Sequence, residues 1–256
     1  MTQADGGETV LSRATRVLEA FRPGTPSLTA SDISRRTGIP MASTHRLVAE
    51  MVRLGLLEKG PDRLLRVGVR LWELGWRSTS ALGLRDLAMP YLEDLQSVVR
   101  QHTQLALLEG TDVLYIERLS ARGQTTVNIT RVAGRLPAHT CSSGLVLLAF
   151  GSQDLQERVL TSELHRFTSR TVVDPAELRR RFADTRRRDS ATLAGSVHLD
   201  AAGVAAPIRN RDRTVVAALS VIVPNSPDTV SSALPAVMAT ARGITRALHH
   251  HPDATR

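Results

Sequence analysis

LTASDISRRTGIPMASTHRLVAEMVRLGLLEK, residues 28–59, is the stretch that decides the fold of the first quarter of the chain. Thr29 is followed three residues later by Asp32, which is a capping-box pattern with Asp in place of the usual Glu. This pattern predicts a short helix through Ser31–Thr37. Gly38 supplies its C-terminal stop, because glycine readily adopts the left-handed conformation that ends helices.

A second helix in the same stretch begins at Ile39-Pro40 and closes at Gly55. Its apolar residues share one face at helical spacing: Leu47, Val48, Met51, Val52 and Leu54. Two helices joined by a short turn that contains glycine predict a helix-turn-helix.

The flanking sequences predict a winged form of this motif. Apolar residues recur at helical spacing from Val10 to Phe21, until Pro23, Gly24 and Pro26 stop that helix. After the motif, Leu56-Leu57 and Leu64-Leu65 flank the turn residues Gly60-Pro61-Asp62, a pattern typical of a β-hairpin. We therefore expect a winged helix-turn-helix DNA-binding domain over residues 8–70.

The charge distribution favours double-stranded DNA as the partner of this domain. The chain carries a net charge of +8, which by itself favours only some polyanion. Residues 35–70 hold eight basic and three acidic side chains, so five of the excess positive charges fall on the motif and its hairpin.

The first turns of the second helix are the expected base-reading element, because these positions face the major groove in a helix-turn-helix. They hold Met41, Ala42, Ser43, His45 and Arg46. Arg46 suits a bidentate contact with guanine, and Ser43 suits a base or a phosphate. The hairpin residues Lys59, Arg63 and Arg66 are expected over the phosphate backbone, together with Arg13, Arg35 and Arg36.

Beyond a linker expected at residues 71–83, the pattern predicts an α+β domain over residues 84–251 with a central antiparallel sheet. An amphipathic helix is expected over about 84–102, with further helices at 143–150, 154–160, 175–188 and 231–249. Strands are expected at 105–108, 113–119, 126–130, 204–208 and 215–223. Tight polar turns such as Asn210-Arg211-Asp212 favour antiparallel pairing.

The quoted stretch resembles the DNA-binding domain of the IclR family of bacterial regulators. The resemblance continues through RLWELGW, GRLPAHTCSSGLVLLAF and GVAAPIRNRDRTVVAALSVIVP and covers nearly the whole chain. It implies a GAF-like effector-binding and oligomerisation domain, a homodimer or tetramer, and a pseudo-palindromic operator whose half-sites are about one helical turn or a multiple of it apart.

The resemblance also implies an effector pocket on one face of the sheet. Its expected contacts are Leu136, Ser142, Ser143, Leu193, Ala201, Gly203, Ser220 and Ile222. Leu193 or Ala194 falls where the family commonly has an acidic residue, and Ile222 replaces a frequent serine. We therefore expect an apolar or aromatic effector, not a small keto acid.

Two other classes of function stay open at this point. Cys141 lies two residues from His139 and would serve a cysteine-dependent enzyme, although this spacing does not pair the side chains on a helix, and a buried thiol is the simpler interpretation. In either an enzyme or a protein–protein adaptor, the N-terminal module would serve only for assembly. No P-loop, GxGxxG or HExxH motif is present, so no cofactor, metal or catalytic activity is expected.

The composition also predicts the cellular compartment of the protein. A single cysteine, a polar start and no apolar run of about 20 residues together predict a cytoplasmic protein without a membrane contact.

Overall fold

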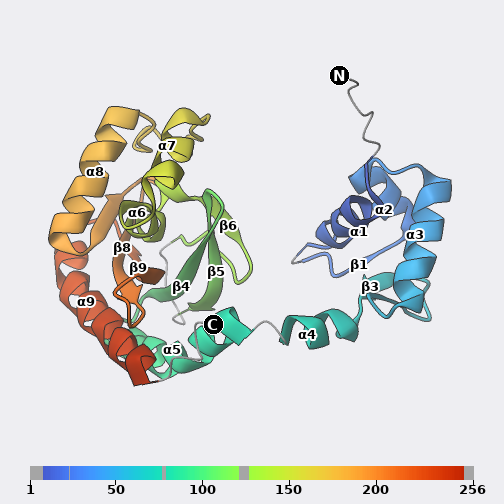
Figure 1. The fold of residues 1–256 in the computed structure, drawn as a ribbon, viewed down its shortest axis with the longest axis horizontal. Helices are drawn as coiled ribbons and strands as arrows, with labels where there is room; N and C mark the ends of the chain where they lie inside the picture. The colour runs from blue at the N-terminus through green and yellow to red at the C-terminus, as the bar shows by residue number, and fades with distance from the viewer. Residues whose placement is uncertain (1–7, 23, 77–78, 121–126, 251–256) are drawn as a thin grey trace. The chain divides into compact units, whose positions relative to one another are not determined.

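The computed structural model describes residues 8–22, 24–76, 79–120 and 127–250, which form two compact units divided between Ser78 and Thr79 (Figure 1). Each unit has its own apolar core, and each is described by itself.

The described residues of the first unit form four helices and a small antiparallel sheet. Its elements are α1 (Val10–Glu19), β1 (Ser27–Leu28), α2 (Ala30–Thr37), α3 (Met41–Arg53), β2 (Leu57–Lys59), β3 (Leu65–Val67) and α4 (Val69–Trp76). The strand order is β1-β3-β2, so the expected hairpin gains a third strand. Its core is formed by the apolar faces of these elements, including Val17, Ile33, Ile39, Met51 and Leu57.

The turn between α2 and α3 is held by the groups that the sequence singles out. Thr29 and Asp32 form the reciprocal capping box, and Gly38 adopts a left-handed conformation with φ of 70°. The Ile39 carbonyl accepts hydrogen bonds from the Ser34 hydroxyl at 2.7 Å and the Thr44 hydroxyl at 3.1 Å. Both helices are therefore tied to one backbone carbonyl, which orients α3 relative to α2 and confirms the helix-turn-helix.

Residues 71–83, expected as a linker, are largely helical. α4 extends to Trp76, and the next helix, α5, already begins at Thr79. VRLWELGW contains no proline, so the chain continues directly from the hairpin into a helix.

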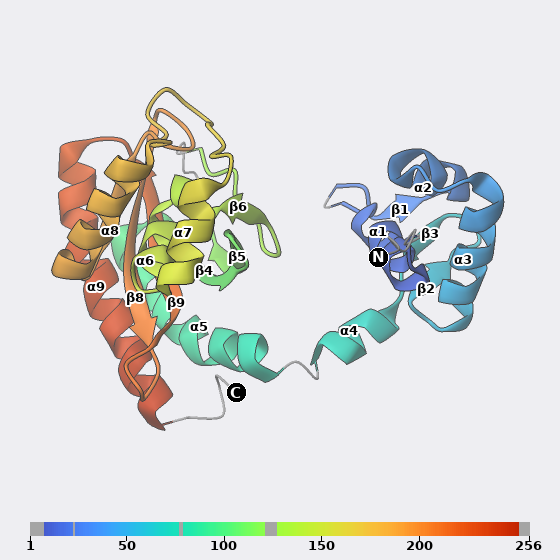
Figure 2. The ribbon, with the colours of Figure 1, turned by 45° about the horizontal axis from the view of Figure 1, so that its top comes forward.

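The second unit is a six-stranded antiparallel sheet between two layers of helices, which confirms the α+β class (Figure 2). Its helices are α5 (Thr79–Val99), α6 (Ser142–Ala149), α7 (Gln153–Thr161), α8 (Pro175–Arg188) and α9 (Pro227–His250). Its strands are β4 (His102–Glu109), β5 (Asp112–Leu119), β6 (Arg135–Pro137), β7 (Ala191–Ala194), β8 (Ala201–Arg209) and β9 (Val215–Pro224), in the order β6-β5-β4-β9-β8-β7.

Separate apolar cores form on the two faces of this sheet. On one face, α5 and α9 pack over residues such as Leu105, Val204 and Leu219. On the other face, α6, α7 and α8 pack over Ala106, Tyr115 and Ala218. The alternation of these residues along β4 and β9 is the period of two that a sheet buried on both faces requires.

The expected strand at 126–130 is wrong for its described residues: 127–130 form no strand, and position 126 lies outside the described residues. Thr130 is fastened instead by side chains, since its backbone N–H and hydroxyl both bond the Asn128 carboxamide oxygen, at 3.0 and 2.7 Å. An Asn side chain that bonds the backbone two residues on is typical of a turn.

Candidate functional site

The first turns of α3 present an exposed polar surface. Met41, Ala42, His45 and Arg46 are exposed, Ser43 is half-buried, and neither His45 nor Arg46 makes an ion pair with any described residue. Thr44, between them, is fully buried because it bonds the turn. The helix therefore directs one face into the domain and leaves the five predicted base-reading side chains at the surface.

The basic residues around α3 differ in how much of their charge is free. Arg66 lies 2.8 Å from Asp62 at the tip of the hairpin, and this contact holds the pKa of Asp62 below its usual value. Arg35 pairs with Asp32 at 2.6 Å, although three quarters of its side chain is exposed. Arg36 donates to the Ala20 carbonyl and thereby fastens α2 to α1.

Lys59, Arg63 and Arg13 show further differences among the predicted phosphate contacts. Lys59 and Arg63 are exposed and form no ion pair with the described residues, whereas Arg13 is half-buried. Arg63 adopts φ of 61°, which places it in the tight turn of the hairpin.

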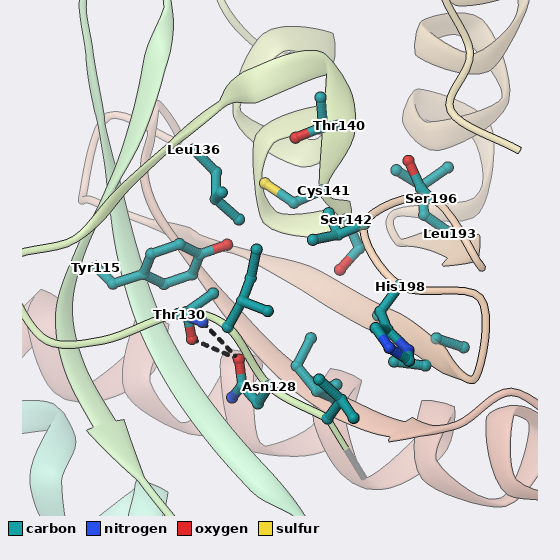
Figure 3. Close-up of a pocket in the computed structure, with 17 residues that line it drawn as sticks. Tyr115, Asn128, Thr130, Leu136, Thr140, Cys141, Ser142, Leu193, Ser196 and His198 are labelled. Carbon is teal, nitrogen blue, oxygen red and sulfur yellow. Dashed lines mark hydrogen bonds between the residues drawn. The ribbon is translucent and has the colours of Figure 1, made fainter. Parts of the chain in front are cut away.

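A pocket opens in the second unit between the N-terminus of α6, the strands β5, β8 and β9, and the chain segments 127–130 and 196–198 (Figure 3). It encloses about 440 Å³ of unoccupied space, counting its open mouth. Its 17 lining residues are Tyr115, Val127, Asn128, Ile129, Thr130, Leu136, Thr140, Cys141, Ser142, Leu193, Ser196, Val197, His198, Ala201, Ala202, Gly203 and Ile222.

Six of the eight residues expected in an effector pocket line this one: Leu136, Ser142, Leu193, Ala201, Gly203 and Ile222. The other two, Ser143 and Ser220, lie outside its lining. Both are buried, and the Ser143 hydroxyl donates to the Ser220 hydroxyl at 2.8 Å. The Ser220 hydroxyl in turn donates to the Gln104 carboxamide oxygen at 3.3 Å, so these hydroxyls link α6 to β9 and β4 beside the pocket.

The start of α6 approaches its surroundings closely through two glycines. A Cβ at Gly144 would lie 2.0 Å from the Ala138 carbonyl oxygen, so α6 can leave its preceding turn only with glycine there. A Cβ at Gly203 would lie 2.5 Å from the Ser142 hydroxyl. Gly203 thus leaves room for the Ser142 hydroxyl, which points into the pocket together with the hydroxyl of Tyr115 (Figure 3).

The polar groups of the pocket lining are neutral hydroxyl, thiol and amide groups together with His198, and no Arg or Lys of the described residues lines it. Burial raises the pKa of the Cys141 thiol, although hydrogen bonds with Tyr115 and the Gly144 amide partly oppose it. Burial also raises the pKa of Tyr115 well above its usual value. The start of α6 adds backbone N–H groups and the positive end of a helix dipole to this side of the pocket.

Sequence reasoning missed the lining residues outside the matched motifs, notably Tyr115 and the segments 127–130 and 196–198. Tyr115 had a detectable signal, because it alternates with Val113 on β5 and both are buried. The pattern at 127–130 predicted a strand that the structure does not have, and no periodicity marks the inward side chains of 196–198.

His139 does not pair with Cys141. Its Nε2 bonds the His165 carbonyl at 2.9 Å, and burial lowers its pKa. No group of three or more His, Cys, Asp or Glu among the described residues could hold a metal ion. Nor is any helix in the described part of the chain both long and apolar enough to cross a membrane.

Comparison with known proteins identifies both units. Residues 10–61 match the family model described as the IclR helix-turn-helix domain, and residues 76–247 match the model described as the bacterial transcriptional regulator IclR C-terminal. The Pca regulon regulatory protein of Pseudomonas putida is 32% identical over 215 residues, which cover 83% of this chain and 73% of that protein. The transcriptional repressor IclR of Escherichia coli is 25% identical over 227 residues, covering 87% and 82%.

A solved structure extends the similarity to both units. The crystal structure of an IclR homolog from Microbacterium hydrocarbonoxydans, complexed with 4-hydroxybenzoate, is 43% identical, covers 94% of this chain and 100% of its own, and superimposes with a TM-score of 0.87. The chain therefore belongs to the IclR family of bacterial transcriptional regulators, with an N-terminal helix-turn-helix for DNA and a C-terminal effector-binding domain.

Proposed function

We propose that this regulator binds a monocyclic aromatic carboxylate of the 4-hydroxybenzoate type in the pocket of its second unit, and that occupancy changes its affinity for operator DNA. The observation that carries the proposal is the composition of the pocket, in which apolar side chains are combined with a few neutral polar groups, among them the hydroxyls of Tyr115 and Ser142 and the carboxamide of Asn128. The 4-hydroxybenzoate complex of the 43% identical structure supports the same ligand class.

The two halves of such a ligand match different parts of the pocket. Leu136, Leu193 and Ile222 offer apolar surface to an aromatic ring, and burial of that surface drives binding. The carboxylate suits the start of α6, where the N–H groups of Ser142 and Ser143 precede the first intrahelical hydrogen bond and the helix dipole favours negative charge beside the Ser142 hydroxyl. A small keto acid would leave most of the apolar wall unfilled.

On the DNA side, we propose that Arg46 and Ser43 read bases, with Met41, Ala42 and His45 beside them. Lys59, Arg63 and Arg66 would lie over phosphates, and Arg13 and Arg35 would add backbone contacts. A homodimer, or a tetramer built from two dimers, would place two such helices on half-sites of a pseudo-palindrome. Light scattering during gel filtration measures this assembly directly, and a monomer that keeps full operator affinity would contradict it.

We also propose that the protein has no catalytic role. Cys141 is the obvious nucleophile, but burial keeps its thiol protonated and His139 is engaged with His165. A protonated, buried thiol is a poor nucleophile. Cys141→Ser should therefore keep operator binding and its response to effector, and loss of a turnover activity on an aromatic ester would contradict this view.

Isothermal titration of the full-length protein tests the ligand class. 4-Hydroxybenzoate should bind, whereas 4-hydroxybenzyl alcohol should bind more weakly for lack of a carboxylate, and pyruvate and glyoxylate should bind least. Leu193→Asp should abolish binding of 4-hydroxybenzoate. Ala194→Asp is the matched control, because Ala194 is the next residue on β7 and is exposed. Tight binding of pyruvate or glyoxylate without binding of aromatic acids would overturn the proposal.

A further inference from the structure

An irregularity in β5 connects the pocket to the opposite face of the sheet. β5 pairs with β4 so that Tyr115 faces Ala106 and Glu117 faces Leu105, which leaves Ile116 as an extra residue in β5. Such a bulge re-aims the side chains that follow it. Tyr115 packs on the α6 face, whereas Ile116 packs on the α5 face, and the pairing of Glu117 with Leu105 places Glu117 there as well.

Arg118 then returns to the pocket face, opposite Gln104. Its guanidinium Nη1 donates to the backbone carbonyl of Thr130 at 2.5 Å, and the Gln104 carboxamide donates to the Thr130 hydroxyl. Thr130 is buried and lines the pocket. Two neighbouring strands thus hold one pocket residue by its side chain and by its backbone.

The side chain of Glu117 links β5 to α5 on the opposite face of the sheet. One carboxylate oxygen accepts the backbone N–H of Arg118 at 2.7 Å, and the other lies 2.7 Å from the guanidinium of Arg85 on α5. The Glu117 side chain is only 8% exposed, so a buried carboxylate is satisfied by these two groups. Removal of either group would leave a buried charge without its partner.

The helix that receives this connection lies next to the DNA-binding unit in the chain. α5 begins at Thr79, the first residue after the division between the units, and Arg85 lies in its second turn. α5 is therefore the element of the second unit that is joined along the chain to the unit with the helix-turn-helix.

We infer that Arg118, Glu117 and Arg85 are positioning residues that transmit the structural effect of effector binding from Thr130 in the pocket to α5. This inference rests on the proposed function, because it assigns the route by which that pocket acts. A ligand that moves segment 127–130 changes the Arg118 contact, which shifts Glu117 and its ion pair with α5. The effector need touch none of the three side chains.

The test measures the ratio of operator affinities with and without saturating 4-hydroxybenzoate, on the operator duplex defined by footprinting. Effectors typically change a second affinity by about 5- to 150-fold. Glu117→Gln and Arg85→Gln should each lower this ratio toward 1, by about 2- to 30-fold, the range found for residues that carry coupling. Operator affinity without effector, and the affinity for 4-hydroxybenzoate, should stay within about twofold of the wild type, which a loss of folding would not allow.

Asp86→Asn is the matched control. Asp86 also bonds the Arg85 guanidinium, at 3.0 Å, but its side chain is largely exposed and makes no hydrogen bond with segment 127–130 in the described part of the chain. Its substitution should leave the ratio unchanged. An unchanged ratio in Glu117→Gln and Arg85→Gln, or an equal loss in Asp86→Asn, would overturn the inference.

Hydrogen exchange separates a failure of this route from a failure of the proposed ligand. If wild-type protein does not bind 4-hydroxybenzoate, the proposed function fails, and the route is still tested in the ligand-free full-length protein. Glu117→Gln should speed amide exchange both at the start of α5 and at Thr130, whose N–H bonds Asn128. Faster exchange confined to α5 would show that the ion pair is only a local clamp.

Discussion

Two single residues have contrasting features: Arg46 is an exposed arginine on α3, and Gly203 is a half-buried glycine in the pocket lining. Arg46 extends from α3 without an ion-pair partner among the described residues, which leaves its planar guanidinium free for a bidentate contact with a base. Gly203 has no Cβ, and this leaves room for the Ser142 hydroxyl in the pocket.

Arg46→Ala should cost about 1–3 kcal/mol of operator binding and relax the preference at one base position. Gel-shift titrations against operator duplexes substituted at each position measure both effects. Arg53→Ala is the control, since Arg53 lies on the same helix but is already paired with Glu50. Equal losses for the two variants at every base position would remove Arg46 from the reading set.

Gly203→Ala should weaken effector binding by displacing the Ser142 hydroxyl, with a loss of about 0.5–1.5 kcal/mol, the contribution of one hydrogen bond. The same change made in a Ser142→Ala background should cost less, because the hydroxyl is no longer there to be displaced. Calorimetry on the two single variants and the double variant measures the difference. Strictly additive losses would show that Gly203 does not act through Ser142.

At the scale of elements, charge determines how the β2–β3 hairpin is expected to bind DNA, and burial determines how the segment before α6 is expected to affect stability. At the tip of the hairpin, Arg66 forms an ion pair with Asp62, whereas Arg63 has no ion pair among the described residues. The two arginines carry the same charge, but only that of Arg66 is partly neutralised by a neighbour.

Arg63→Ala should weaken binding to all DNA sequences alike and lower the slope of log affinity against log salt by about 0.9, the value for one phosphate contact. Arg66→Ala should lower this slope less, because Asp62 already neutralises part of its charge. Fluorescence anisotropy between low and moderate salt measures the slopes. A loss specific to one operator sequence would show that the hairpin reads bases.

The segment before α6 should make stability depend on pH. Burial lowers the pKa of His139 below its usual value of 6.5, so the unfolded chain takes up this proton more readily than the folded one. The free energy of unfolding should therefore fall as the pH drops below about 6.5. In His139→Gln this fall should be smaller, and in the control His198→Gln, at a partly exposed position, it should persist. Denaturant unfolding at pH 7.5 and 5.5 measures the free energy of unfolding of each protein at both pH values. If His139→Gln shows the same pH dependence as the wild type, His139 is not its cause.

The elements with strong periodicity or clear caps could be predicted, and the short or irregular ones could not. The capping box at Thr29, the Gly38 stop and the 175–188 helix are all present as expected. β6 and β7 have three and four residues, too few for a period of two to stand out. The bulge at Ile116 leaves no mark in the alternation of apolar residues, since it depends on pairing with a strand elsewhere in the chain.

Residues of the pocket were likewise predictable where a motif marks them, and not where tertiary packing decides which side chain faces inward. Leu136, Ser142, Leu193, Ala201, Gly203 and Ile222 lie in or beside motifs that the family resemblance covers, and all six line the pocket. Ser143 and Ser220 match the same motifs, but which of two neighbouring hydroxyls faces a cavity is decided by packing between α6 and β9. Asn128 and Ser196 come from irregular segments whose course is set only by tertiary contacts.

At the scale of the whole molecule, the chain joins a unit that carries the helix-turn-helix to a unit that holds a pocket. Each unit has its own core, and regulation requires that effector binding favours one arrangement of the molecule over another. α5 is the element of the second unit that follows directly on the first in sequence.

The most direct test of effector control is the affinity of the full-length protein for its operator duplex as 4-hydroxybenzoate is added, measured by fluorescence anisotropy at fixed salt. We predict a saturable change in affinity of at least about fivefold, which is lost in Leu193→Asp and kept in Ala194→Asp. An operator affinity that stays constant up to saturating 4-hydroxybenzoate, or one that responds to pyruvate instead, would contradict it.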